Sequence, residues 1–164
     1  MEPGFRLKPI AEFRKYKRNL PHWEDPGNVY FVTFNISQEL ILSDASKDIV
    51  FASIEFHAGK KYKLYSCVVM DTHIHLVLQP LSESNGNYFS LASITHSIKS
   101  FSANRIQRLL KIKGKIWQDE NYDRIVRGDK DFLEFMEYVI RNPVKAGLVD
   151  SPESYKWLFY EGSI

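Results

Sequence analysis

The sequence has a single cysteine, no long hydrophobic run and no targeting pattern at its start. Cys67 therefore has no partner for a disulfide within the chain. No stretch approaches the roughly 18 uncharged apolar residues that a membrane-spanning helix needs. Residues 1–20 also lack the apolar run and small-residue cleavage site of a secretory signal. These absences argue against a secreted or membrane protein, and we expect a cytoplasmic protein without a membrane partner.

Acidic residues are also missing from a long part of the chain. None occurs between positions 84 and 118, and a block at positions 6–18 has Glu12 as its only acid among six cations. Blocks of one charge are typical of proteins that bind a polyanion such as DNA, although a solvated helix face can give the same pattern. The candidate DNA-binding residues in these blocks are Lys15, Arg18, Lys99, Arg105, Arg108 and Lys111.

Length and composition fit one compact globular domain. The chain has 164 residues, of which 44% are hydrophobic and 26% charged. Residues 1–27 contain several prolines and no sustained periodicity, so they are predicted to form a basic N-terminal arm. The domain proper is predicted to span residues 28–164.

The hydrophobic periodicity predicts four strands and three helices. The order is a strand, a helix, a two-stranded hairpin, a long helix, a fourth strand and a last helix that Pro143 stops. This β-α-β-β-α-β order with a C-terminal helix predicts an α+β, ferredoxin-like fold, in which an antiparallel sheet has two helices on one face. The predicted strands are 29–36, 62–70, 73–79 and 122–126, and the predicted helices are 46–57, 91–109 and 132–140.

The segment Asp71-Thr-His-Ile-His places two histidines at alternate positions of a predicted strand. Alternate side chains of a strand point to the same face, so His73 and His75 are expected to lie side by side. Two neutral imidazoles in this arrangement can bind one divalent cation, with further ligands from elsewhere. Taken alone, the pair could also be two ordinary half-buried strand histidines.

The last predicted helix carries a second pair of candidate functional residues. Tyr138 and Asn142 are four residues apart, which places a phenol and a carboxamide one turn apart on one helix face. A tyrosine hydroxyl can attack phosphorus when a cation stabilises the phosphate charge, and the amide oxygen of Asn142 could complete the shell of that cation. The alternative is that Tyr138 packs in the core and Asn142 ends the helix before Pro143.

Four blocks of the sequence together resemble the REP-associated tyrosine transposases, which belong to the wider superfamily of single-tyrosine HUH transposases. HUH denotes two histidines separated by a hydrophobic residue. The blocks span roughly residues 28 to 160 in the order and spacing typical of that family, and Asp71 differs from the Asn that many members have. They are 68–78 with the His-Ile-His core, 94–104 with Lys99 and Phe101, 116–127, and 138–148 with Tyr138 and Asn142.

The resemblance implies a metal-dependent DNA nuclease and strand transferase. It implies that His73 and His75 bind a divalent metal, Mg²⁺ or Mn²⁺, that Asn142 assists the metal and that Tyr138 attacks the scissile phosphate. The expected partner is single-stranded or hairpin DNA, and the expected assembly is a monomer or homodimer. Two alternatives stay open, a rolling-circle replication initiator or relaxase with the same chemistry, and a non-catalytic ferredoxin-like module that binds nucleic acid.

Overall fold

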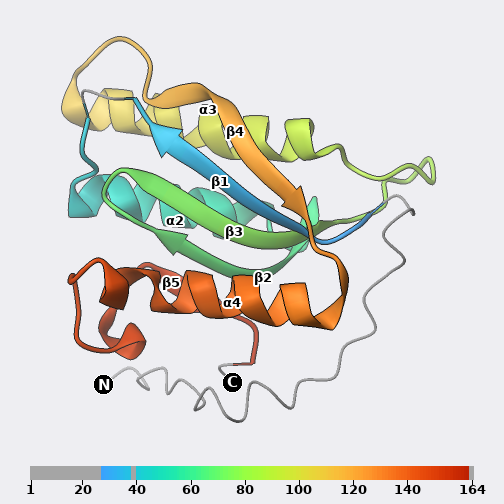
Figure 1. Ribbon diagram of the computed structural model, residues 1–164. Helices are drawn as coiled ribbons and strands as arrows, with labels where there is room; N and C mark the ends of the chain where they lie inside the picture. Colours follow the sequence, from blue (N-terminus) through green and yellow to red (C-terminus); the bar gives the residue numbers. More distant parts are fainter. Residues whose placement is uncertain (1–26, 38–39, 163–164) are drawn as a thin grey trace, which may run out of the picture.

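The computed structural model describes residues 27–37 and 40–162 (Figure 1). They form an α+β fold with a five-stranded antiparallel sheet and three helices, which confirms the predicted fold class. The strands lie in the order β4-β1-β3-β2-β5. The elements are β1 (Tyr30–Ile36), α2 (Asp44–His57), β2 (Tyr62–Val69), β3 (His73–Pro80), α3 (Leu91–Leu110), β4 (Trp117–Ile125), α4 (Gly128–Lys145), a 3-10 turn (Pro152–Ser154) and β5 (Leu158–Tyr160).

The sheet is covered by α2 and α3 on one face and by α4 on the other (Figure 1). On the first face, Ser53 of α2 donates to the carbonyl of Ile98 of α3, and the Trp117 indole of β4 donates to Ser102 of α3. The other face, which we call the α4 face, is marked by the stacking of Phe31 of β1 on Phe135 of α4. Both sides therefore have an apolar layer, and β3 lies between them near the middle of the sheet.

Several element boundaries differ from the sequence-based predictions, most clearly the end of the last helix and the start of the fourth strand. The last helix does not stop at Pro143 but continues to Lys145. A proline so close to the end removes only its own hydrogen bond, and Ala146 and Leu148 close the end by donating to the carbonyls of Asn142 and Pro143. The fourth strand begins at Trp117 rather than at residue 122, because pairing with β1 keeps its exposed, acid-rich first half extended.

Strand β5 was not predicted. It is three residues long and pairs with the outer edge of β2. A segment this short has too few alternations to stand out by its pattern, and its conformation depends on an edge that exists only in the folded sheet.

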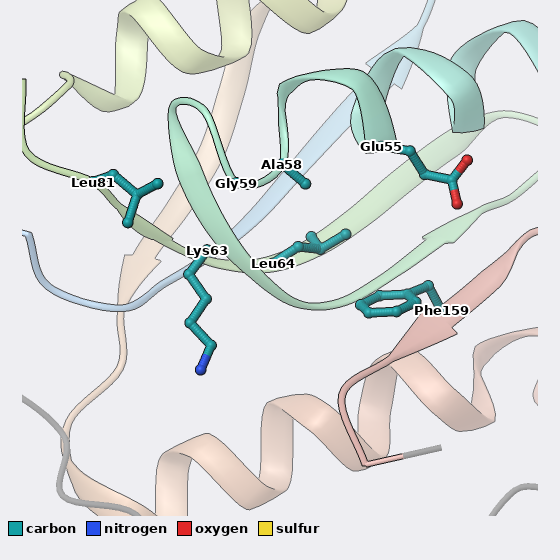
Figure 2. Close-up of a pocket in the computed structure, with 7 residues that line it drawn as sticks. All are labelled: Glu55, Ala58, Gly59, Lys63, Leu64, Leu81 and Phe159. Atoms are coloured by element: carbon teal, nitrogen blue, oxygen red, sulfur yellow. The ribbon is translucent and has the colours of Figure 1, made fainter. Parts of the chain in front are cut away.

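A hollow of about 650 Å³ lies beside this edge, between the end of α2, the start of β2 and β5 (Figure 2). Its lining is mostly apolar, with the carboxylate of Glu55 as its acidic group and Lys63 at its margin. None of the residues predicted to carry chemistry lines it, so the candidate site must be sought on the α4 face.

Candidate active site

The two histidines of β3 lie side by side on the α4 face, as the alternation of the strand predicts. Their ring centroids are 4.7 Å apart. The intervening Ile74 and the following Leu76 are fully buried in the core. His75 is 4% exposed, whereas His73 is half-buried. The local alternation thus anchors β3 through its apolar residues and leaves two imidazoles facing α4.

Helix α4 brings the predicted tyrosine and asparagine to the histidines. The Tyr138 ring meets the His75 ring edge to face, with centroids 5.0 Å apart at 75°. Asn142 is buried and hydrogen-bonds with His73. Tyr138 is 41% exposed, so its ring contacts the site while remaining accessible from outside. The structure therefore assembles all four residues from two elements that are distant in sequence.

Burial favours the neutral form of both histidines. Burial, with the adjacent His73 as a smaller cause, lowers the pKa of His75 to about 3. Burial also lowers the pKa of His73, against the hydrogen bond with Asn142 and the charge of Asp71, which raise it. The neutral imidazole is the form that binds metal ions, since its free nitrogen carries a lone pair.

The donor atoms of this cluster fit a divalent cation. The Nε2 atom of His75 is buried and has no hydrogen-bond partner. Its other nitrogen, Nδ1, is hydrogen-bonded to Thr33 at 2.7 Å. Buried polar atoms are rarely left without a partner, so the open Nε2 is a feature that a bound cation would satisfy. Within the described ranges, no group of three or more His, Cys, Asp or Glu side chains that could hold a metal ion is found.

Sequence reasoning missed three residues around this cluster. Thr33 of β1 lies opposite His75 in the sheet register. Phe31 stacks on the His75 ring with centroids 5.5 Å apart. Lys145 places its amine 5.7 Å from the centroid of the Tyr138 ring. Lys145 stood inside one of the family-like blocks, but nothing in the sequence indicated which residues of β1 lie opposite β3.

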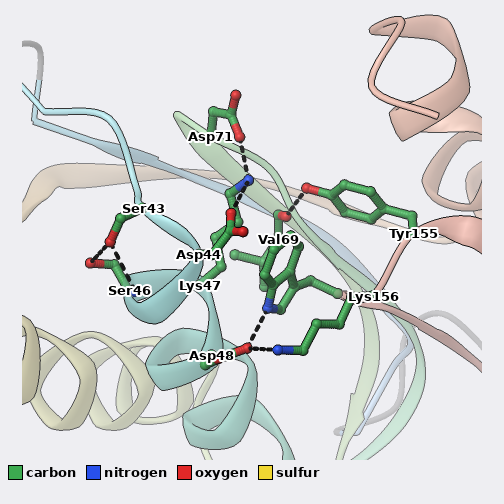
Figure 3. A network of polar contacts seen from close by, with 10 residues as sticks. Ser43, Asp44, Ser46, Lys47, Asp48, Val69, Asp71, Tyr155 and Lys156 are labelled. Atoms are coloured by element: carbon green, nitrogen blue, oxygen red, sulfur yellow. Dashed lines mark hydrogen bonds and ion pairs between the residues drawn. The ribbon is translucent and has the colours of Figure 1, made fainter.

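The turn before His73 is held by an ion pair that explains how Asp71 is accommodated (Figure 3). The Asp71 carboxylate lies 2.5 Å from the amine of Lys47, a buried residue of α2. The same turn is anchored from the C-terminal side, because the Tyr155 hydroxyl donates to the carbonyl of Val69 at 2.7 Å. The carboxylate of Asp71 is thus paired with Lys47, and its charge still acts on His73 by raising the pKa of that histidine.

The predicted DNA-binding cations of α3 lie away from this cluster, since α3 covers the opposite face of the sheet. Lys99 is half-buried and donates to the carbonyl of Gln118 at 2.8 Å. Arg105 lies over the Phe101 ring, 3.4 Å from its centroid. Arg108 and Lys111 are exposed at the end of the helix. Lys15 and Arg18 lie outside the described residues.

Comparison with known proteins supports the resemblance seen in the sequence. The chain is 27% identical, over 141 residues, to a Haemophilus influenzae protein named as a candidate REP-associated tyrosine transposase, and the match covers 76% of this chain and 74% of that protein. This relative confirms the resemblance to that family. No family model matches the chain.

A solved structure confirms the fold. It is that of a REP-associated tyrosine transposase bound to a REP hairpin, and it superposes with a TM-score of 0.65 over 88% of this chain and 81% of that one, at 21% identity. In the part of the chain that is described, no helix is long and apolar enough to cross a membrane.

Proposed function

We propose that this protein is a transposase that cuts and rejoins single-stranded DNA beside a hairpin, with Tyr138 as the nucleophile. The observation that supports it most is the edge-to-face contact of the exposed Tyr138 ring with His75, whose buried Nε2 has no hydrogen-bond partner. A buried ring nitrogen without a hydrogen-bond partner and an accessible tyrosine lie together where α4 covers the sheet. This arrangement suits phosphoryl transfer better than a role in packing alone. The relatives described above are named as REP-associated tyrosine transposases, one of them bound to a REP hairpin, which supports the broader conclusion that this protein is a transposase.

The proposed metal site consists of His73, His75 and Asn142. Two imidazoles and an amide oxygen, without thiolates, suit Mg²⁺ or Mn²⁺ with open positions better than a closed structural zinc site. A divalent cation bound there would supply positive charge to the non-bridging oxygens of the scissile phosphate.

Tyr138 carries out the covalent step in this proposal. Its Oη forms a bond to the scissile phosphorus, and the bond from phosphorus to the 3′ oxygen breaks. The phenol proton passes to solvent, and the departing 3′ oxygen takes up a proton from solvent. The products are a 5′-phosphotyrosine on the protein and a DNA strand with a free 3′-hydroxyl. Attack by a second 3′-hydroxyl reverses the step and joins strands, so no nucleotide cofactor is consumed. Within α4, Tyr138 is the single tyrosine, as expected for the single-tyrosine class.

A covalent-adduct assay tests this function. Labelled single-stranded oligonucleotides with a hairpin are incubated with the protein and Mn²⁺, and the products are separated on a denaturing gel. We expect a labelled band that migrates with the protein and requires the cation. Hairpin binding without cation-dependent cleavage or adduct would instead support a non-catalytic binding module, which the cation-rich α3 would also suit.

We further propose that the exposed cations of α3 bind DNA without taking part in the chemistry. Replacing Arg108 with Ala should weaken hairpin binding and lower the slope of log affinity against log salt by roughly 0.7 to 0.9 for each lost phosphate contact. Arg105→Ala should act in the same direction, and cleavage at saturating DNA should persist. Fluorescence anisotropy over a salt series measures the slope.

Lys63→Ala is the matched control for this experiment. It also removes one exposed cation, but from the β2 edge, where Lys63 pairs with Glu161. The control should leave the slope unchanged. Equal slopes for the wild type and both α3 variants would place the DNA on another surface.

A further inference from the structure

A threonine hydroxyl lies beside the Nδ1 atom of each histidine in the cluster. Thr33 of β1 is 2.7 Å from Nδ1 of His75, and Thr72 is 3.1 Å from Nδ1 of His73. The two contacts differ in setting, since Thr33 is partly buried beneath α4 whereas Thr72 is exposed in the turn before β3. In both, the ring nitrogen that remains for another partner is Nε2.

We propose that Thr33 is a positioning residue that holds His75 with its proton on Nδ1, so that the lone pair of Nε2 is available to a divalent cation. This inference rests on the proposed function, because it assumes that His75 serves as a metal ligand. It adds a residue from β1 to a site otherwise built from β3 and α4. No family block of the sequence includes Thr33.

The first argument concerns the hydrogen bonds available to the two ring nitrogens of the buried His75. A neutral imidazole has one N–H donor and one bare nitrogen, and burial keeps His75 neutral. With the proton on Nδ1, Thr33 accepts the N–H bond. With the proton on Nε2, that N–H group would be a buried donor without a partner, because Nε2 has no hydrogen-bond partner in the structure. An unpaired buried donor is the costlier arrangement, so the contact with Thr33 favours the form that binds metal.

The second argument is that the ring itself has little freedom to rearrange. Phe31 stacks against the His75 ring at an interplanar angle of 18°, and Tyr138 packs on it from α4. These apolar contacts fix the plane of the ring but cannot distinguish its two nitrogens. The Thr33 hydroxyl is the polar contact that does so, and the antiparallel register places Thr33 directly opposite His75.

The third argument separates Thr33 from Thr72. A hydrogen bond in an exposed turn competes with water, so Thr72 should have little influence on the tautomer of His73. Thr72→Val therefore serves as the matched control for Thr33→Val. Both changes replace a hydroxyl with a methyl group of the same shape, and Thr33→Ser restores the hydroxyl.

Two measurements on the full-length protein test the inference. Nitrogen-15 NMR of the imidazoles, recorded without metal, reports which nitrogen of His75 carries the proton. Calorimetry with Mn²⁺ reports the affinity. We expect the proton on Nδ1 in the wild type, a loss of roughly 10- to 100-fold in Mn²⁺ affinity for Thr33→Val, recovery in Thr33→Ser and no comparable loss in Thr72→Val.

The possible outcomes distinguish a failure of this inference from a failure of the proposed function. A wild-type His75 with its proton on Nε2 overturns the inference, even if Thr33→Val does not fold well enough for calorimetry. Equal Mn²⁺ affinity of the wild type and Thr33→Val also overturns it and leaves the proposed metal site standing. No binding of Mn²⁺ by the wild type would overturn both.

Discussion

The Tyr138→Phe variant should form no covalent adduct with DNA while it binds hairpin DNA and Mn²⁺ as the wild type does. The substitution removes one oxygen and keeps the ring that packs edge to face on His75 and Phe31. The free energy of unfolding should therefore change by no more than about 0.5 kcal/mol, as for other substitutions at partly exposed positions. Cleavage should fall below detection, because the reaction loses its nucleophile. Gel assays and thermal melting measure the two effects.

Tyr122→Phe is the control for this variant. Tyr122 is 58% exposed and lies opposite Thr33 on β4, so it presents another exposed tyrosine on the α4 face that also carries the histidines. Its Phe variant should retain the adduct. Digestion of the trapped adduct and mass spectrometry should then locate the DNA on Tyr138, and attachment to Tyr122 or full cleavage by Tyr138→Phe would contradict the assignment.

The second large effect is expected from replacing both histidines. The double variant His73→Ala, His75→Ala should lose cleavage and the stabilisation by Mn²⁺. A cation that binds only the folded wild type at 100 times its Kd adds about 2.7 kcal/mol to the free energy of unfolding, and the variant should gain none. Because His75 is buried against Phe31, its loss also leaves a cavity, so some decrease in Tm without metal is expected.

A third histidine provides the control. His96 is exposed on α3, on the other face of the sheet, and His96→Ala should cleave DNA and gain stability from Mn²⁺ as the wild type does. The metal proposal fails if Mn²⁺ does not raise the Tm of the wild type and the double variant melts far lower, since the histidines would then be structural.

The fold and the core of the site could be predicted from the sequence because both depend on local patterns. Alternation on β3 and the four-residue spacing on α4 fix the faces on which His73, His75, Tyr138 and Asn142 lie. The resemblance to a known family then indicated that the histidine-bearing face of β3 and the tyrosine-bearing face of α4 lie against each other. None of these four residues requires the strand register to be known before it can be predicted.

The residues that could not be predicted depend on long-range pairing. Thr33 contacts His75 only because β1 and β3 pair in one register, and many registers are compatible with so apolar a strand as β1. The side of the sheet that α3 covers is likewise set by packing, so the sequence could not reveal that Lys99 and Arg105 lie away from Tyr138. Strand β5 forms only because β2 offers a free edge.

The segment around β5 stabilises two other parts of the fold. Besides pairing β5 with β2, it holds α2 through the ion pair of Lys156 with Asp48 (Figure 3). The Trp157 indole also donates to the Asp48 carboxylate, at 2.8 Å. Helix α2 in turn fixes Asp71 through Lys47. Trimming this segment, or fusing a bulky tag close to Tyr160, would therefore loosen the turn that precedes His73.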